Sequence, residues 1–232
     1  MFERRSYQKE LLDGELFGKE HLFQNLKELD YINTHLGGHR ISIRGIKKIM
    51  LDKSRKYNLI DIGCGGGDSL RAIAGWAEKN GFDLSLTGVD LLEDCIGYAR
   101  ESCKRYPHIV FNCADFRELV FPSERINIVH ASLFCHHFNE EEISEFVSFC
   151  SRAGAIFIIN DLERNVMAYY SIKWLTSFFS KSHMVKNDAP LSVLRGFKKS
   201  EWQSVLKIAG IRNYVIENRW AFRHLLIIYP NE

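Results

Sequence analysis

The chain has 232 residues, of which 46% are hydrophobic and 26% are charged, and this composition is typical of a globular protein with one sizeable core. Its formal net charge is only +2, and the Lys and Arg residues are spread along the chain. The charge therefore gives no strong electrostatic attraction to nucleic acid or to an anionic membrane. We expect neither of them as a partner.

Two further features concern the compartment. The first residues, Met1 to Arg5, have no apolar segment after their charges, and no apolar run is long enough to cross a bilayer. We therefore expect a cytoplasmic protein with no membrane span. The cysteines lie mostly in apolar stretches without a CxxC pair, which predicts free thiols, no disulfide and no structural zinc. They are Cys64, Cys95, Cys103, Cys113, Cys135 and Cys150.

The first fifty residues are predicted to be helical. Apolar residues recur at helical spacing in two stretches on either side of the pair Gly37-Gly38: Leu22, Phe23, Leu26 and Leu29 before it, and Ile41, Ile46 and Ile49 after it. We expect these helices to cap a sheet.

From residue 57 onward, short β-like runs alternate with helical stretches. The pattern predicts strands at 57–62, 84–90, 109–113, 126–131 and 155–160, with helices at 67–80, 92–105 and 140–152. Such alternation favours an α/β protein with a parallel sheet and helices on both faces. Residues 162–190 are rich in aromatic side chains and show no clear strand. A helix at 198–209 and an antiparallel hairpin of strands 212–217 and 223–229 follow, and the four prolines are interpreted as local punctuation.

A glycine-rich turn joins the first strand to the next helix in the segment Asp61-Ile62-Gly63-Cys64-Gly65-Gly66-Gly67-Asp68. Glycines allow close approach of backbone to a ligand, and the helix N-terminus offers free N–H groups. The dinucleotide fingerprint needs a third glycine where Asp68 stands, which disfavours pyrophosphate. Asp90 ends the next strand and suits a ribose diol, and Asp115 and Phe116 after the third strand suit an adenine ring.

These motifs, together with Ala131-Ser132 at the end of the fourth strand, resemble those of class I S-adenosylmethionine-dependent methyltransferases over residues 57–160. The resemblance implies a Rossmann-like, seven-stranded, mostly parallel sheet with an antiparallel last strand. It also implies S-adenosylmethionine as the cofactor. The implied cofactor-binding residues are Asp61, Gly63, Cys64, Gly65, Asp90, Leu91, Asp115, Phe116 and Ser132. Each acid also has a purely structural alternative: Asp61 could cap the following turn, Asp90 could cap the next helix, and Asp115 could be a surface turn residue.

Candidate catalytic residues follow the fourth strand, where the family places groups between cofactor and substrate. His137 is the first choice for a general base and His136 the second, although one of them could only stabilise the loop. The acidic residues that follow fit an exposed helix start, so no metal site is predicted. The segment from His130 to Phe134 lacks the prolines of amino-methylating branches, which favours an oxygen or carbon acceptor.

We predict that residues 1–232 form a single methyltransferase domain, as the resemblance implies, and that this domain has four parts. These are a helical cap at 1–56, a cofactor-binding core at 57–160, a helical lid insertion at 161–197, and a last helix with a hairpin at 198–232. The aromatic stretch from Tyr169 to Phe179 is expected to close over an apolar acceptor, or else to be the buried face of an ordinary helix.

Several short segments resemble small methyltransferases associated with polyketide-type pathways, which implies a phenolic, fatty or quinone-like acceptor. They are Tyr31 to Asn33, Gly37 to Arg40, Asp161 to Arg164, Asp188 to Arg195 and Trp220 to Arg223. The alternatives are a protein or RNA methyltransferase using the basic stretch from Arg44 to Lys56, and a non-catalytic cofactor-binding partner protein. The sequence does not fix the oligomeric state.

Overall fold

Seven strands form one sheet in the computed structural model, which describes residues 2–12, 18–118, 121 and 126–231. The strands are β1 (Lys56–Ile62), β2 (Asp83–Asp90), β3 (Val110–Cys113), β4 (Ile126–Ser132), β5 (Ile156–Leu162), β6 (Tyr214–Arg219) and β7 (Arg223–Ile228). Their spatial order is β3-β2-β1-β4-β5-β7-β6, and β7 alone runs in the direction opposite to the other six strands. The predicted mostly parallel sheet with an antiparallel last strand is confirmed.

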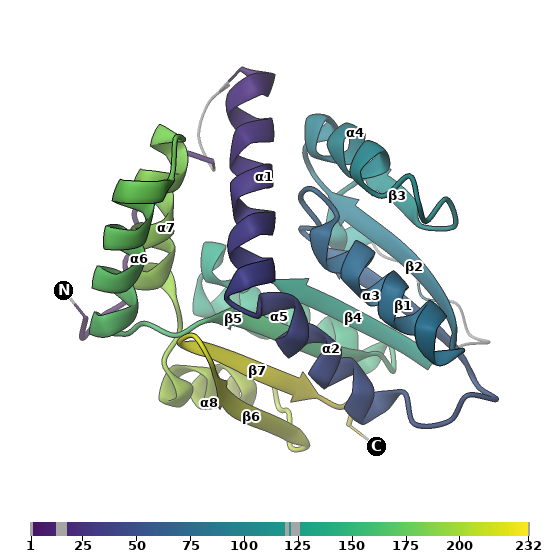
Figure 1. Cartoon of the computed structure of the whole chain (residues 1–232). Helices are drawn as coiled ribbons and strands as arrows, with labels where there is room; N and C mark the ends of the chain where they lie inside the picture. Colours follow the sequence, from purple (N-terminus) through teal and green to yellow (C-terminus); the bar gives the residue numbers. More distant parts are fainter. Residues whose placement is uncertain (1, 13–17, 119–120, 122–125, 232) are drawn as a thin grey trace.

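Helices cover both faces of this sheet (Figure 1). They are α1 (Lys19–His35), α2 (Gly38–Ile49), α3 (Asp68–Asn80), α4 (Glu93–Ser102), α5 (Glu140–Arg152), α6 (Val166–Phe179), α7 (His183–Arg195) and α8 (Lys199–Ile208). One core cluster joins α2, α3 and α4 to the sheet, and the other joins α5 and α8 to its opposite face. Because the central strands are buried on both sides, their sequences are nearly continuous apolar runs.

The three remaining helices stand at the carboxyl edge of the parallel strands. α1 rises between α4 and the α6–α7 pair (Figure 1). Leu26 of α1 approaches the glycine turn, because a Cβ added at Gly65 would lie 3.5 Å from its Cδ2 atom. α2, by contrast, packs against the sheet face through Ile41 and Ile46. The N-terminal helices therefore cap both the sheet face and the edge at which ligands bind in open α/β sheets.

Residues 162–190, which show no clear pattern in the sequence, form most of α6 and α7. Pro190 lies inside α7, so its interpretation as a break was wrong. A proline in a helix removes one backbone hydrogen bond. Here Leu191, Val193 and Leu194 bury the same turn in the protein interior, and this packing outweighs the local preference. Among the described residues, no helix has the length and apolar character needed to cross a membrane.

Candidate active site

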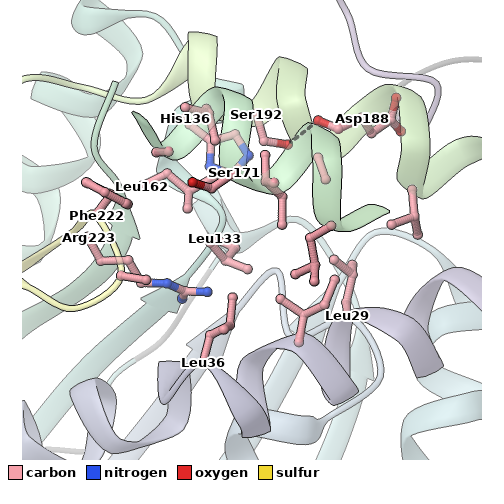
Figure 2. A pocket seen from close by; sticks show the side chains of 18 of the residues that line it. Leu29, Leu36, Leu133, His136, Leu162, Ser171, Asp188, Ser192, Phe222 and Arg223 are labelled. Atoms are coloured by element: carbon pink, nitrogen blue, oxygen red, sulfur yellow. Dashed lines mark hydrogen bonds between the residues drawn. The ribbon is translucent and has the colours of Figure 1, made fainter. Parts of the chain in front are cut away.

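A cavity of about 690 Å³ lies above the carboxyl ends of β4 and β5, between α1, α6 and α7 (Figure 2). Its walls are mainly apolar side chains from these helices and from the strand ends. They include Leu29, Ile32, Leu36, Leu133, Leu162, Ile172, Leu175, Val185 and Val193. Polar groups are fewer, and the ionisable ones among them are Glu10, His136, His137, Tyr170, Asp188 and Arg223. An apolar chamber with a small number of polar groups is the usual form of a small-molecule site.

The glycine turn begins where β1 ends, and its conformation requires glycine. Gly63 has φ +62°, and a Cβ built on it would lie 2.1 Å from the ring of Phe134 in the loop after β4. Gly65 has φ +49°, also in the left-handed region that side chains rarely adopt. Cys64 between them is buried, and burial raises the pKa of its thiol well above the usual range. The Cys64 side chain is therefore not available to a ligand, and contact of the turn's backbone with the cofactor stays a prediction.

Asp90 at the end of β2 lies against this turn. The N–H of Gly65 donates to its Oδ2 atom at 2.9 Å, and the N–H of Leu92 donates to its Oδ1 atom at 3.0 Å. Burial raises the pKa of this carboxyl, whereas the two backbone hydrogen bonds lower it. Each carboxylate oxygen can accept a further hydrogen bond, so the residues present fit a ribose diol. Leu91 beside it is 64% exposed.

Asp61 lies beneath the turn and is almost fully buried. Its Oδ1 atom is 2.6 Å from His130 Nδ1, and the other ring nitrogen of His130 is 2.8 Å from Ser42 Oγ. Asn160 donates to the same Ser42 oxygen at 3.0 Å. This chain of polar contacts ties β1, β4, β5 and α2 together directly under the glycine turn. Asp61 therefore positions the turn from below, and His130 is the partner that the sequence did not suggest.

The remaining residues implied for the adenine end differ in their exposure. Asp115 accepts from the N–H of Arg117 at 2.9 Å and forms an ion pair with its guanidinium at 3.0 Å. The Phe116 ring is buried and contacts Phe146 at 4.6 Å between centroids, within an aromatic cluster of the core. Ser132 accepts from Asn160 at 3.4 Å. Contacts of these residues with adenine stay predictions.

His136 sits at the cavity wall in a buried polar cluster. Its backbone N–H and its Nδ1 atom contact the two oxygens of Asp161 at 3.0 and 2.7 Å, and its Nε2 atom is 3.5 Å from Glu10. Burial alone lowers the pKa of His136, but the Asp161 and Glu10 carboxylates outweigh burial and raise that pKa from 6.5 to about 9. At neutral pH the ring therefore carries two protons and has no free lone pair to act as a base.

His137 has a different setting. It also lines the cavity, its side chain is 18% exposed, and its Nε2 atom lies 3.9 Å from Glu10 Oε2. The two imidazole rings are 4.4 Å apart, so both histidines border the same chamber. Of the two side chains that line the cavity, His137 is the more exposed, whereas His136 is buried against Asp161.

Glu10 and Arg195 complete this cluster and were not predicted as site residues. Glu10 is buried, accepts from Ser192 at 2.8 Å, and lies 3.8 Å from the Nε atom of Arg195. Its sequence neighbourhood gives no signal, because the contacts join segments far apart in the chain. Asp161 and Arg195 stood in short segments noted only for their resemblance to other methyltransferases.

Two groups of residues in the described parts of the chain could offer ligands to a metal ion. They are Glu10 with His136 and His137, and Asp30 with His39 and Asp68. A guanidinium accompanies each group, since Arg195 lies 3.8 Å from Glu10 and Arg71 lies 2.6 Å from Asp30. A cation already placed at this distance disfavours a second one, and we assign a metal to neither group.

The aromatic stripe on α6 is not buried, and the expectation of a buried helix face was wrong. Tyr170 and Trp174 are 59% and 61% exposed while also lining the cavity. Only Ala168 and Thr176 of this helix are buried. The stripe stays exposed because α6 contacts mainly α7 and stands apart from the sheet (Figure 1).

Comparison with known proteins adds to this geometry. Residues 59–154 match the family described as "Methyltransferase domain". The chain is 24% identical over 162 residues to the mitochondrial ubiquinone biosynthesis O-methyltransferase of Saccharomyces cerevisiae, a match that covers 57% of this chain and 50% of the yeast protein. The match therefore spans about half the length of that curated relative.

Solved structures share the fold at low sequence identity. Human N-acetylserotonin methyltransferase in complex with SAM has a TM-score of 0.66 at 13% identity, covering 93% of this chain and 57% of that chain. The plantazolicin methyltransferase in complex with SAH and a pentazolic analog has a TM-score of 0.64 at 17% identity, covering 92% of this chain and 96% of that chain. These structures compare with the present chain over nearly its whole length.

Proposed function

Because the chain carries a class I methyltransferase domain that uses S-adenosylmethionine, we propose that it methylates an oxygen or carbon atom of a small apolar acceptor. The acceptor is phenolic or quinone-like, and it binds in the cavity between α1, α6 and α7. The predicted fold is confirmed by the related structures, and the predicted enzyme class and methyl donor are confirmed by the domain match. The acceptor and the residues that act on it are the content of the proposal.

The observation that carries the proposal is the position of the cavity. It lies between the loop after β4, which contacts Gly63 through Phe134, and a wall of aliphatic side chains from α1 and α7. A chamber of about 690 Å³ suits a small molecule. An apolar body would be desolvated there, and burial of apolar area supplies the affinity.

S-adenosylmethionine supplies an activated methyl group on a sulfonium when bound. The backbone of the turn at Gly63 and Gly65 and the Asp90 carboxylate would hold it, and Asp61 with His130 fixes the turn from beneath. The apolar walls align the acceptor and exclude water, which raises the frequency of a productive approach. His137 at the cavity wall accepts the acceptor's hydroxyl proton, while His136 and Glu10 fix the loop that carries it.

The polymer alternative receives less support. The basic stretch that a protein or RNA methyltransferase would need is partly neutralised, because Lys48 pairs with Glu217 and Arg55 lies 3.5 Å from Asp52. Arg44 also lies 3.8 Å from Glu217. A non-catalytic partner protein would not need an apolar chamber next to the loop after β4. We also propose a cytoplasmic location, because all six cysteines are free thiols.

The test is an activity screen with isotopically labelled S-adenosylmethionine against phenols, quinols, fatty acids and tRNA. Label transfer to phenols or quinols is the expected result. Transfer to tRNA alone would replace this function with the RNA-modifying one. No transfer to any class, with S-adenosylhomocysteine still bound, would favour the non-catalytic partner.

A further inference from the structure

Arg223 is the first residue of β7 and its side chain lines the cavity. It pairs in the sheet with Leu162 at the end of β5, which brings it to the carboxyl edge of the parallel strands. Figure 2 shows its guanidinium extending toward Leu36 and Leu133, far from Asp188 on the other side of the chamber. The residue is only 4% exposed. A buried positive charge therefore faces a mostly apolar space.

The partners of this guanidinium are neutral. One nitrogen donates to Asn33 Oδ1 at 2.8 Å and the other to Asn160 Oδ1 at 3.5 Å. Within the described parts of the chain, no carboxylate lies within ion-pair distance of it. The acids that act on it from further away are already engaged, Asp161 by His136 at 2.7 Å and Asp68 by Asn33 at 3.0 Å.

Comparison with the other buried arginines makes this setting distinctive. Arg5 contacts Glu140 at 3.1 Å, Arg164 contacts Glu201 at 2.5 Å, and Arg195 lies 3.8 Å from Glu10. Each of these three therefore has a carboxylate, as buried charges in proteins generally do. Arg223 differs from them in facing a ligand chamber instead of a protein acid. Burial lowers its pKa from 12.5 to about 10, which still leaves the group charged at neutral pH.

We propose that Arg223 binds a carboxylate carried by the methyl acceptor, so that the acceptor is an apolar acid. The inference rests on the proposed function, because it takes the chamber to be the acceptor site. A guanidinium presents a planar fork of donors that matches a carboxylate, and such charge-assisted hydrogen bonds strengthen where water is excluded. The aliphatic residues of α1 and α7 then contact the hydrocarbon or aromatic body of the same molecule.

Two ligands of nearly equal shape, one with a carboxylate and one with a neutral amide, test whether Arg223 binds a carboxylate. Binding of 4-pentylbenzoate and of 4-pentylbenzamide to the full chain is measured by calorimetry with saturating S-adenosylhomocysteine. We expect the carboxylate to bind about 10-fold to 100-fold more tightly than the amide, the range of a charge-assisted hydrogen bond. Arg223→Met should abolish this preference and leave binding of the amide unchanged. Arg223→Lys keeps the charge without the fork and should retain part of the preference.

Arg219→Met is the matched control, because it removes one positive charge from the same hairpin at a residue outside the chamber's lining. Its carboxylate preference should equal that of the wild type. If circular dichroism shows that Arg223→Met is unfolded, the ratio of carboxylate to amide affinity is compared between the wild-type chain and Arg223→Lys instead.

Three outcomes would overturn the inference, and they differ in what else they affect. Equal affinity of both ligands for the wild type removes the acidic acceptor but keeps the proposed function. Failure of both ligands to bind removes the chamber as the acceptor site, and the proposed function falls with it. Weaker binding of S-adenosylhomocysteine to Arg223→Met, with an unchanged carboxylate-to-amide ratio, would assign Arg223 to the carboxylate of the cofactor.

Discussion

The imidazole of His136 and the carboxylate of Asp161 form a buried hydrogen bond of 2.7 Å beside the chamber between α1, α6 and α7. A second contact, from the His136 backbone N–H to the same carboxylate, fixes the loop after β4 against the end of β5. The pKa of His136 is raised to about 9 and that of Asp161 is lowered, so this pair is ionic at neutral pH. The loop that carries His137 is thereby held by an electrostatic contact whose strength depends on pH.

The stability of the protein should therefore fall as the pH rises from about 6.5 to about 9. A raised folded-state pKa contributes stability that is complete below the unfolded pKa of 6.5 and is lost as the pH passes through the folded value of about 9. Across this range the free energy of unfolding should drop by up to about 3 kcal/mol. Urea unfolding at pH 6.5 and pH 9.5 measures the change. Asp161→Asn should flatten this dependence, whereas Glu141→Gln on the exposed start of α5 should not; equal slopes in all three proteins would contradict the assignment.

His137→Ala should reduce turnover by about 100-fold while leaving the affinity for S-adenosylhomocysteine nearly intact. The reason is that His137 lines the chamber, with its Nε2 atom 3.9 Å from Glu10 Oε2. Steady-state kinetics and calorimetry measure the two quantities. His183→Ala, at the exposed start of α7, is the control and should behave as the wild type. Loss of cofactor binding equal to the loss of turnover would make His137 a wall of the cofactor site instead of a base.

The sequence predicted those parts of the fold that depend on local patterns. β1 and β5 are buried on both faces, so they appear in the sequence as apolar runs. α5 begins after Asn139 with a capping box and spans the predicted residues 140–152. The glycine turn and Asp90 were predictable because a strand, a turn and a helix follow each other directly. Their contact through the Gly65 N–H agrees with that spacing.

The acceptor side could not be predicted in the same way, because its contacts join distant segments. Glu10 meets His136 and Ser192 only after α7 has packed across the N-terminal segment. Arg223 reaches Asn33 through a hydrogen bond between residues 190 positions apart. The alternative of a buried aromatic face on α6 followed what aromatic stripes usually do, yet only Ala168 and Thr176 of this helix are buried.

Asp90→Ala should weaken the binding of S-adenosylhomocysteine by about 1 to 3 kcal/mol, the range for charge-assisted hydrogen bonds. Two effects combine in this loss. The substitution removes acceptors for a ribose diol, and it frees the Gly65 N–H that donates to Asp90 at 2.9 Å. Calorimetry provides the affinity, and Asp90→Asn, which keeps one acceptor oxygen, should lose less. Asp83→Ala at the opposite end of β2 is the control; a folded Asp90→Ala protein with wild-type affinity would remove Asp90 from the cofactor site.

Trp174→Ala should raise the Michaelis constant for an apolar acceptor without lowering the thermal stability of the protein. Trp174 is 61% exposed and lines the chamber, so it contributes little to the core but offers its ring to a ligand. Loss of a large apolar contact corresponds to about 1 to 3 kcal/mol of acceptor binding, with no change in cofactor affinity. Phe179→Ala is the matched control, because Phe179 is 72% exposed on the same helix and does not line the chamber. A drop in melting temperature for Trp174→Ala alone would indicate a packing role, and unaltered acceptor kinetics in a stable variant would remove α6 from the acceptor site.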